Sequence, residues 1–529
     1  PPRSTLFPYT TLFRSPAAPL GLITLAALLP ADWDIRLIDL NVTDMDESAM
    51  DWADLVFIGG MLPQQGNFLH LVEMVHRHGK KVVAGGPDPT SQPEIYQSAD
   101  YLVLGEAESS LPPFLKDMES GTPRKTYIPE CRPDIRQTPI PRFDLLDLGS
   151  YLMIGVQFCR GCPFNCEFCD IIELYGRVPR TKTPEQVVAE LERLYSLGYR
   201  GHIDFVDDNF IANKKQSRNI LKAVKEWSHQ RKHPFFYSTE ASIDLADDDE
   251  LLGLMKDVDF RYVFIGIETG DEQILKNAQK KQNLGRDLVE DLYKIYRHGI
   301  VVNAGFIVGF DGESRESARQ IVEIVERGKI CMAMIGLLYA LPNTQLTRRL
   351  EREKRLFSER SELKKHSEIS VDQATSGINF ITRRPRAQII EDFVYIIDQV
   401  YDKKKYFDRV LALSEVIEID YKFKPSPGRI WRYVKGFFKL VYILGIRPST
   451  AYHYWRNLVV CLFTKPSTLE NTANLMAMYI HFRKQTKFIV RMMTEALQTL
   501  HEMGEKNFYH QRITGYALEE NPEGAGKRP

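Results

Sequence analysis

Gln157-Phe-Cys-Arg-Gly-Cys-Pro-Phe-Asn-Cys-Glu-Phe-Cys-Asp170 is the most informative stretch of this sequence, because it places four cysteines within eleven positions. Three of them, Cys162, Cys166 and Cys169, have the spacing C-x3-C-x2-C and follow a predicted strand. Three thiolates on one short loop can hold three irons of a cubane and leave the fourth iron open to an external ligand. Electron-transfer cubanes use four cysteines at a different spacing. The stretch therefore predicts a 4Fe-4S cluster with one open iron.

Two alternatives remain for the same cysteines. Cys159 supplies a fourth sulfur, and a closed zinc site uses four ligands, although the spacing is more cramped than in a usual pair of zinc knuckles. Buried, inert thiols are the other alternative. The chain has seven cysteines in 529 residues, which is too few for a secreted disulfide framework. The cysteines therefore indicate a metal site in a reducing compartment.

Short apolar runs alternate with helical stretches on the carboxyl side of this loop. Six such strands predict a barrel or partial barrel, whose chemistry lies at the carboxyl ends of the strands. The predicted strands are Ile154–Phe158, His202–Val206, Phe235–Thr239, Tyr262–Ile267, Val301–Val308 and Met334–Ala340.

A second alternating pattern precedes the cysteines and predicts a parallel sheet buried on both faces. Several of its strands end in glycine, which lets a flat ligand approach the backbone closely. A further strand is expected before Leu20, and it is missing from the pattern. The predicted strands are Asp34–Leu40, Asp54–Gly60, Lys81–Gly86 and Tyr101–Gly105.

The composition is that of a globular protein, with 43% hydrophobic and 26% charged residues, which excludes disordered and collagen-like chains. The net charge of −1 conceals an asymmetry: residues 1–150 carry 12 basic and 20 acidic residues, whereas 422–493 carry 13 basic residues and one acid, Glu470. The longest apolar run, Leu20–Pro30, is too short to span a bilayer. These patterns divide the chain as follows: 1–16 an artefactual or disordered start, 17–120 the first α/β domain, 121–150 a Pro-rich linker, 151–385 the barrel, 386–515 a helical domain and 516–529 a disordered tail.

The motif formed by Cys162, Cys166, Phe168 and Cys169 resembles the signature of the radical S-adenosylmethionine (SAM) superfamily. The resemblance implies a 4Fe-4S cluster whose open iron chelates SAM, and reductive cleavage of SAM to a 5'-deoxyadenosyl radical. It also implies that Cys159 is not a ligand, and it assigns no catalytic side chain. The residues implied to contact SAM are Asp207, Asp208, Asn209, Glu240, Glu268, Gly305 and Gly309.

The first α/β domain resembles the flavodoxin-like cobalamin-binding domain that precedes the barrel of many radical SAM enzymes. The motif Asp-x-His-x-x-Gly, which supplies a histidine to cobalt in some relatives, is absent from the sequence, and His70, His76 and His78 are interpreted as helix-surface residues. The resemblance implies cobalamin contacts at Gly59, Gly60, Met61, Leu62, Gly85, Gly86, Gly105 and Glu106.

The whole layout resembles the group that includes the hopanoid C-2 methylases, and this implies cobalamin-dependent methylation of an unactivated carbon, with a small-molecule or lipid substrate. The alternatives are radical rearrangement, cyclisation or coupling without methyl transfer, and a zinc-stabilised binding protein without catalysis. We expect a cytoplasmic protein that takes electrons from a flavodoxin or ferredoxin and binds no nucleic acid. Residues 422–493 interleave basic and aromatic residues, which is typical of a solvated helix face packed on the barrel; the alternative is docking of a basic amphipathic helix at the inner membrane face.

Overall fold

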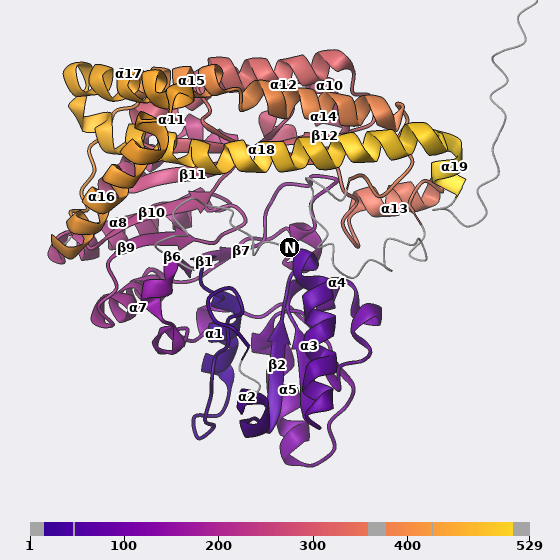
Figure 1. Cartoon of the computed structure of the whole chain (residues 1–529). Helices are drawn as coiled ribbons and strands as arrows, with labels where there is room; N and C mark the ends of the chain where they lie inside the picture. Colours follow the sequence, from indigo (N-terminus) through magenta and orange to yellow (C-terminus); the bar gives the residue numbers. More distant parts are fainter. Residues whose placement is uncertain (1–14, 46–47, 358–376, 426, 511–529) are drawn as a thin grey trace, which may run out of the picture.

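The computed structural model describes residues 15–45, 48–357, 377–425 and 427–510. Figure 1 shows the N-terminal domain at the bottom, the barrel strands above it and a layer of long helices along the far side of the barrel. The expected tail at 516–529 lies outside the described residues, as does most of the start at 1–16.

The N-terminal domain is a parallel sheet with the strand order β2-β3-β4-β5. Val82 and Ala84 pack into one apolar cluster and Val83 into another, so both faces of the sheet are buried as the sequence predicts. Its strands are β2 (Leu55–Gly59), β3 (Lys81–Gly85), β4 (Tyr101–Val103) and β5 (Thr126–Tyr127), and its α-helices are α1 (Leu20–Leu28), α2 (Ser48–Trp52), α3 (Gln65–Arg77), α4 (Pro87–Ser91) and α5 (Ala107–Glu119).

Two sequence predictions in this domain are wrong. Asp34–Leu40 forms no strand; Asp39 is buried in a turn, where its carboxylate accepts hydrogen bonds from the backbone N–H of Asn41 and the hydroxyl of Tyr151. The Pro-rich segment 121–150 is more than a linker, because β5 lies within it and pairs with β4.

The barrel is an open sheet of parallel strands in the order β1-β6-β9-β10-β11-β12-β13. The six predicted strands are confirmed with shifts at their ends. The addition is β1 (Ser15–Ala17), which overlaps the segment 1–16 that was predicted to be artefactual or disordered and pairs with β6 instead of the N-terminal sheet. The other strands are β6 (Tyr151–Val156), β9 (Gly201–Phe205), β10 (Phe235–Glu240), β11 (Phe260–Glu268), β12 (Val301–Val308) and β13 (Met332–Leu337).

Helices cover the outer face of this sheet because alternate strand residues point toward them. Ile203 and Phe205, for example, share one apolar core with Val187 and Leu221 of the covering helices. The intervening residues of β9, His202 and Asp204, face the inside of the barrel. The covering helices are α7 (Pro184–Ser196), α8 (Lys214–Gln230), α9 (Asp249–Val258), α10 (Glu272–Asn277), α11 (Leu288–Arg297), α12 (Arg315–Arg327) and α13 (Gln345–Arg352).

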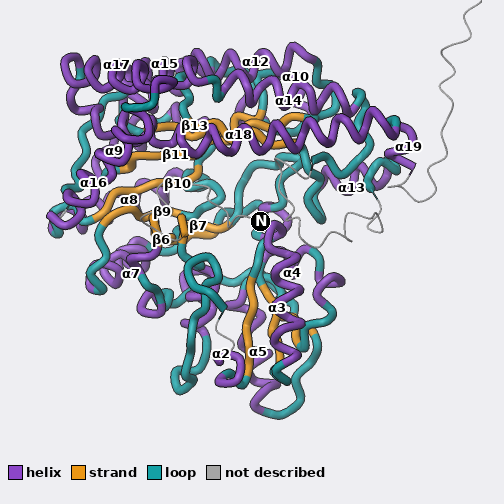
Figure 2. The backbone as a smooth tube through the Cα atoms, viewed as in Figure 1, coloured by secondary structure: helices purple, strands orange, loops and turns teal. Residues whose placement is uncertain are grey.

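The C-terminal region is helical, as the sequence predicts, and shares its core with the barrel. Figure 2 shows it as a layer of helices, with α18 running the length of the barrel. In the part of the chain that the structure describes, no helix combines the length and the apolar character that crossing a bilayer requires. The elements are α14 (Arg386–Val400), α15 (Lys403–Val416), α16 (Pro427–Leu440), the π-helix η10 (Val441–Gly445), α17 (Pro448–Thr464), α18 (Leu469–Met503) and α19 (Glu505–His510).

Candidate active site at the facing sheet edges

The cysteine loop leaves the carboxyl end of β6 through the short strand β7 (Cys159–Arg160) and ends at α6 (Ile171–Leu174). Backbone hydrogen bonds fix it: Cys162 N–H bonds to Gly176 O at 3.2 Å, and Glu167 N–H to Ala278 O at 3.0 Å. Gly161 has a φ of 92°, and a Cβ there would lie 2.8 Å from the same Gly176 oxygen. The path of the loop therefore requires glycine at this position.

The environment of the three thiols suits an anionic iron–sulfur cluster. The side-chain amides of Asn209 and Gln282 donate to Cys162 Sγ at 3.9 Å and to Cys166 Sγ at 3.6 Å. Burial raises the pKa of Cys162, so an unligated thiol there holds its proton and metal binding releases it. Hydrogen bonds to sulfur are among the means by which a protein tunes such a cluster.

Lys280 supplies the positive charge beside these sulfurs. Burial acts against its charge, but the carboxylate of Glu268 and the thiols of Cys166 and Cys169 together raise its pKa. Its Nζ lies 2.8 Å from Glu268 Oε1. No sequence pattern marks Lys280 or Gln282, because both follow an ordinary helix and belong to no motif.

Cys159 lies in β7 at the entry to the loop and is 1% exposed. Burial raises the pKa of its thiol, and the carboxylates of Asp207 and Asp208 add to the shift. No three histidine, cysteine or carboxylate side chains among the described residues converge on a point that would hold a single metal ion. That Cys159 is not a ligand stays a prediction.

Asp207, Asp208 and Asn209 follow β9 and contact the cysteine loop. Asp207 Oδ1 accepts the backbone N–H groups of Phe158 and Cys159 at 2.9 and 2.5 Å, so this carboxylate shapes the loop. Burial raises the pKa of Asp208 to about 6, and its Oδ2 is buried without a hydrogen-bond partner in the described chain. A buried, unpaired carboxylate oxygen next to the thiols fits the ammonium or hydroxyl groups of SAM.

Glu240 and Glu268 end β10 and β11 on the same rim. Enclosure by the barrel raises the pKa of Glu240 to about 7, and the carboxylates of Asp204 and Asp208 add to the shift, while its side chain stays open to solvent. Glu268 has a φ of 66° at a bulge in β11 and is engaged by Lys280. Glu268 is thus linked to the cysteine loop through Lys280, and Glu240 lies near Asp208.

The two predicted glycines of β12 differ in their surroundings. A Cβ on Gly305 would lie 2.8 Å from the ring of Phe264, so glycine there makes room inside the barrel. Gly309, with a φ of 114°, donates its N–H to the buried Glu313 at 2.7 Å and faces Ile378. The contacts of Gly309 do not include the other predicted SAM residues.

The carboxyl edge of the N-terminal sheet is rich in glycine. A Cβ on Gly85 would meet the Val103 carbonyl oxygen at 2.8 Å, and one on Gly86 would meet the backbone of Gly60 at 3.2 Å. Met61, which is 60% exposed, stands on this edge, and Gly59, Leu62 and Gly105 continue it. An edge whose own residues are mostly glycine fits the approach of a flat macrocycle.

The histidines of α3 are confirmed as helix-surface residues. His76 bonds to Asp100 at 2.8 Å and His78 to Asp51 at 3.1 Å. Both lie near the amino ends of the strands, because α3 returns there to begin β3. Neither is placed to reach a ligand at the carboxyl edge.

Buried ion pairs join the two edges. Arg160, on the cysteine loop, bonds to Glu106 at 2.7 Å and to Glu108 at 2.8 Å, and Arg180 bonds to Glu106 at 2.8 Å. The carboxylate that we expected to face cobalamin is thus engaged across the domain interface, and its contact with cobalamin stays a prediction. Asn343, beyond β13, adds a 2.8 Å hydrogen bond to the carbonyl of Ser91. The strand ends of the two domains therefore face each other.

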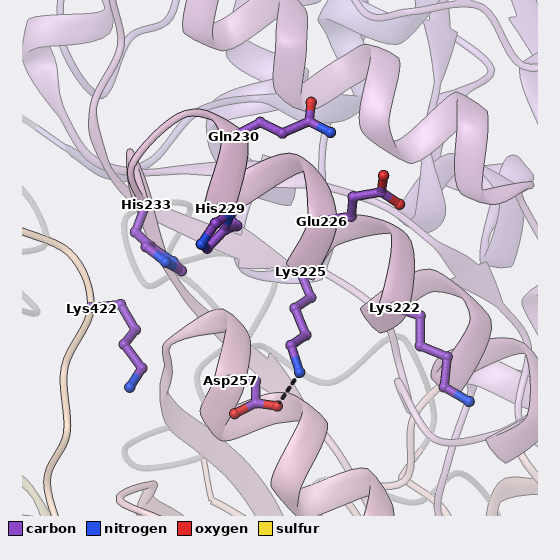
Figure 3. Close-up of a pocket in the computed structure, with 8 residues that line it drawn as sticks. All are labelled: Lys222, Lys225, Glu226, His229, Gln230, His233, Asp257 and Lys422. Carbon is purple, nitrogen blue, oxygen red and sulfur yellow. Dashed lines mark hydrogen bonds and ion pairs between the residues drawn. The ribbon is translucent and has the colours of Figure 1, made fainter.

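A surface hollow lies elsewhere (Figure 3). It is lined by the end of α8 and by Lys422, at the amino ends of the strands, and its cations are neutralised: Lys225 pairs with Asp257 at 2.7 Å and Lys222 with Glu250 at 3.4 Å. It therefore carries none of the chemistry predicted from the sequence.

Comparison with known proteins agrees with this geometry. Residues 156–325 match the model of the radical SAM superfamily, residues 9–115 match that of the B12 binding domain, and residues 344–495 match a domain of unknown function (DUF4070). An uncharacterized methyltransferase of Synechocystis is 40% identical over 91% of this chain and 88% of its own. The hopanoid C-2 methylase of Rhodopseudomonas palustris is 31% identical over 83% of this chain and 82% of its own.

The chain belongs to the cobalamin-binding radical SAM family. Solved structures show the same fold. OxsB with aqua-cobalamin bound has a TM-score of 0.58, 14% identity, and coverage of 94% of this chain and 79% of its own. TsrM of Kitasatospora setae with cobalamin and a 4Fe-4S cluster bound has a TM-score of 0.57, 16% identity, and coverage of 91% and 97%.

As a radical SAM protein, it is an enzyme that uses a 4Fe-4S cluster, SAM and cobalamin and acts on a small-molecule substrate. Membership of the family replaces the zinc-stabilised binding protein that the cysteines alone left open. The three-thiol loop, the unpaired Asp208 oxygen and the glycine edge each fit the cofactor that the family places there.

Proposed function

We propose that the protein is a cobalamin-dependent radical SAM methyltransferase that methylates an unactivated carbon of a lipid. The observation that carries the proposal is the contact between the two edges through Arg160, Glu106 and Glu108. It supports placing a methyl carrier on the glycine edge directly opposite the cysteine loop. The names of the similar methyltransferases, one of which acts on a hopanoid, support the same reaction and lipid substrate.

The bound cofactors supply the radical and the methyl group when loaded. The chain positions them: Cys162, Cys166 and Cys169 would hold the cluster, and Asp208 and Glu240 would bind polar groups of SAM. Lys280 holds a positive charge beside the sulfurs, which favours their anionic form. Asp207 keeps the entry to the loop in place through two backbone N–H groups.

Partners follow from this chemistry. Reductive cleavage of SAM needs one electron from outside the chain, and we propose a flavodoxin or a ferredoxin as its source. A lipid substrate also suggests that the enzyme works in the cytoplasm as a peripheral protein at the inner membrane face.

The test is anaerobic incubation of the reconstituted enzyme with methyl-labelled SAM, cobalamin, a reductant and a lipid extract from a strain that lacks the enzyme. We expect 5'-deoxyadenosine and a labelled lipid. Deoxyadenosine together with a rearranged or coupled, unlabelled product would favour the radical reaction without methyl transfer. Absence of deoxyadenosine from iron-loaded enzyme would overturn the assignment of the cysteine loop.

A further inference from the structure

The helices α16, η10 and α17 carry an apolar surface that the rest of the described chain does not cover. We call it the aromatic face. Its large apolar side chains are each at least 40% exposed, and Phe463 reaches 80%. The members are Ile430, Trp431, Tyr433, Phe437, Phe438, Tyr442, Ile446, Tyr452, Trp455, Val459, Leu462 and Phe463.

The pattern of α17 shows that this exposure is a property of a whole helix side. Tyr454, Leu458 and Cys461 are buried on one side, where α17 packs against α15 and α18. Tyr452, Trp455, Val459 and Leu462 follow the opposite side at spacings of three and four and are exposed. A helix that is apolar on both sides is expected to be covered on both, so the outer side of α17 lacks a partner within the described chain.

Basic residues occur among the aromatic residues of this stretch of sequence, whereas acidic residues do not. No aspartate or glutamate occurs between Lys422 and Leu469. Lys435 lies 5.5 Å from the Trp431 ring, and Lys439 and Arg447 are exposed on the same elements. In the described ion pairs of the region, Lys422 pairs with Asp420 and Arg456 with Asp408. The aromatic face is thus cationic overall.

The positive charge and the exposed apolar rings of the aromatic face favour one kind of binding partner. A second copy of the same face would bring like charges together, which costs free energy in a two-fold interface. An anionic bilayer instead offers phosphates to the lysines and a hydrocarbon boundary to the apolar rings, and Trp and Tyr are favoured at that depth. We propose that the aromatic face docks this enzyme on membranes that contain anionic phospholipids; the proposal rests on the lipid substrate of the proposed function.

The position of the face leaves the active site free. The segment that leads into α16 packs at the amino ends of the strands. There the ring centroids of Phe423 and Phe236 lie 5.5 Å apart, and the Arg261 guanidinium lies 3.9 Å from the centroid of the Tyr421 ring. The cobalamin-type domain lies at the carboxyl ends. Docking through α16 and α17 therefore does not compete with the contact between the two domains (Figure 1).

Cosedimentation of the full-length, cluster-loaded protein with vesicles tests the docking. One set is phosphatidylcholine alone and the other contains phosphatidylglycerol. We expect binding to the anionic vesicles at least tenfold tighter than to the neutral ones, because exposed cations add about 1 kcal/mol each near an anionic surface. Trp431→Ser combined with Phe438→Ser and Phe463→Ser should weaken vesicle binding at least tenfold. Lys435→Glu with Lys439→Glu should abolish the preference for anionic lipid.

The matched control is Val178→Ser, because Val178 is 76% exposed on the cysteine-loop side of the barrel and should leave vesicle binding unchanged. All variants should form deoxyadenosine from SAM at the rate of the parent, which separates this proposal from the proposed function. Equal binding to both vesicle sets, or no loss in the triple variant, would overturn the docking. A protein dimer that the triple variant dissociates would assign the face to a second copy instead.

Discussion

The two sheets meet through their carboxyl edges, and these edges are built from different groups. The barrel rim carries thiols, carboxylates and Lys280, and most of these polar atoms already have a partner. The N-terminal edge carries glycines whose missing side chains let neighbouring backbone segments pack closely. The barrel rim is suited to hold its cofactors through thiol and charged groups, whereas the N-terminal edge is suited to hold cobalamin because its glycines carry no side chain. Substitutions should therefore have different effects on the two edges.

The largest effect is expected on the barrel rim. Cys162→Ala should remove one of three cluster ligands and abolish deoxyadenosine formation and most iron binding, since Asn209 offers no thiolate in its place. Iron content and deoxyadenosine yield after anaerobic reconstitution measure this. The exposed Cys131→Ala is the control and should retain both. Cys159→Ala should also retain both, and loss of iron in that variant would show that Cys159 is a ligand.

The contact between the edges ranks second. Arg160→Met removes one partner of the buried carboxylates Glu106 and Glu108, which keep Arg180 and Thr138, and breaking a buried pair costs up to about 3–5 kcal/mol of folding free energy. We expect a lower midpoint in urea and faster proteolysis between the domains. Adding Glu106→Gln and Glu108→Gln should recover much of the loss. Arg136→Met, which breaks only an exposed pair with Asp134, should change stability by less than about 1 kcal/mol.

On the glycine edge the expected effects are smaller and steric. Gly85→Ala puts a Cβ 2.8 Å from the Val103 carbonyl oxygen, and relieving that overlap should cost about 1–3 kcal/mol. Cobalamin affinity should fall while cluster assembly is unchanged. Gly21→Ala in α1 is the matched control, because no atom lies within 4 Å of its added Cβ. A stable Gly85→Ala protein with full cobalamin affinity would show that cobalamin binding does not require glycine at this position.

The smallest effect concerns the charge of Glu240. Its pKa is about 7 in the fold against 4.5 for an unperturbed glutamate, so the folded protein keeps a proton that the unfolded chain releases between these values. Its stabilising contribution is complete below about pH 4.5 and is lost as the pH rises to about 7. Glu240→Gln should flatten that part of the stability curve, measured by urea denaturation at several pH values. An unchanged slope in the variant would assign it to other groups.

Local patterns predicted the parts that depend on neighbours in sequence. The spacing of Cys162, Cys166 and Cys169 and the apolar runs of the barrel strands needed no tertiary information. Asp34–Leu40 was predicted to be a strand, but Asp39 lies at a turn, where its carboxylate accepts hydrogen bonds from Asn41 and from Tyr151, which is far away in the sequence. The roles of Lys280 and Arg160 were missed for a related reason: each acts on residues that only the folded chain brings near.

The short strand β1 has a consequence for biosynthesis. Ser15 pairs with Tyr151 and Ala17 with Met153, so the whole N-terminal domain is nested between two adjacent strands of the barrel sheet. At about 5–20 residues per second, the ribosome delivers the second partner roughly 7–30 s after the first. The N-terminal domain must therefore fold while β1, the strand that precedes it, is still unpaired. Chaperones or ligands that act in that interval meet this domain before β6, the partner of β1, has been synthesised.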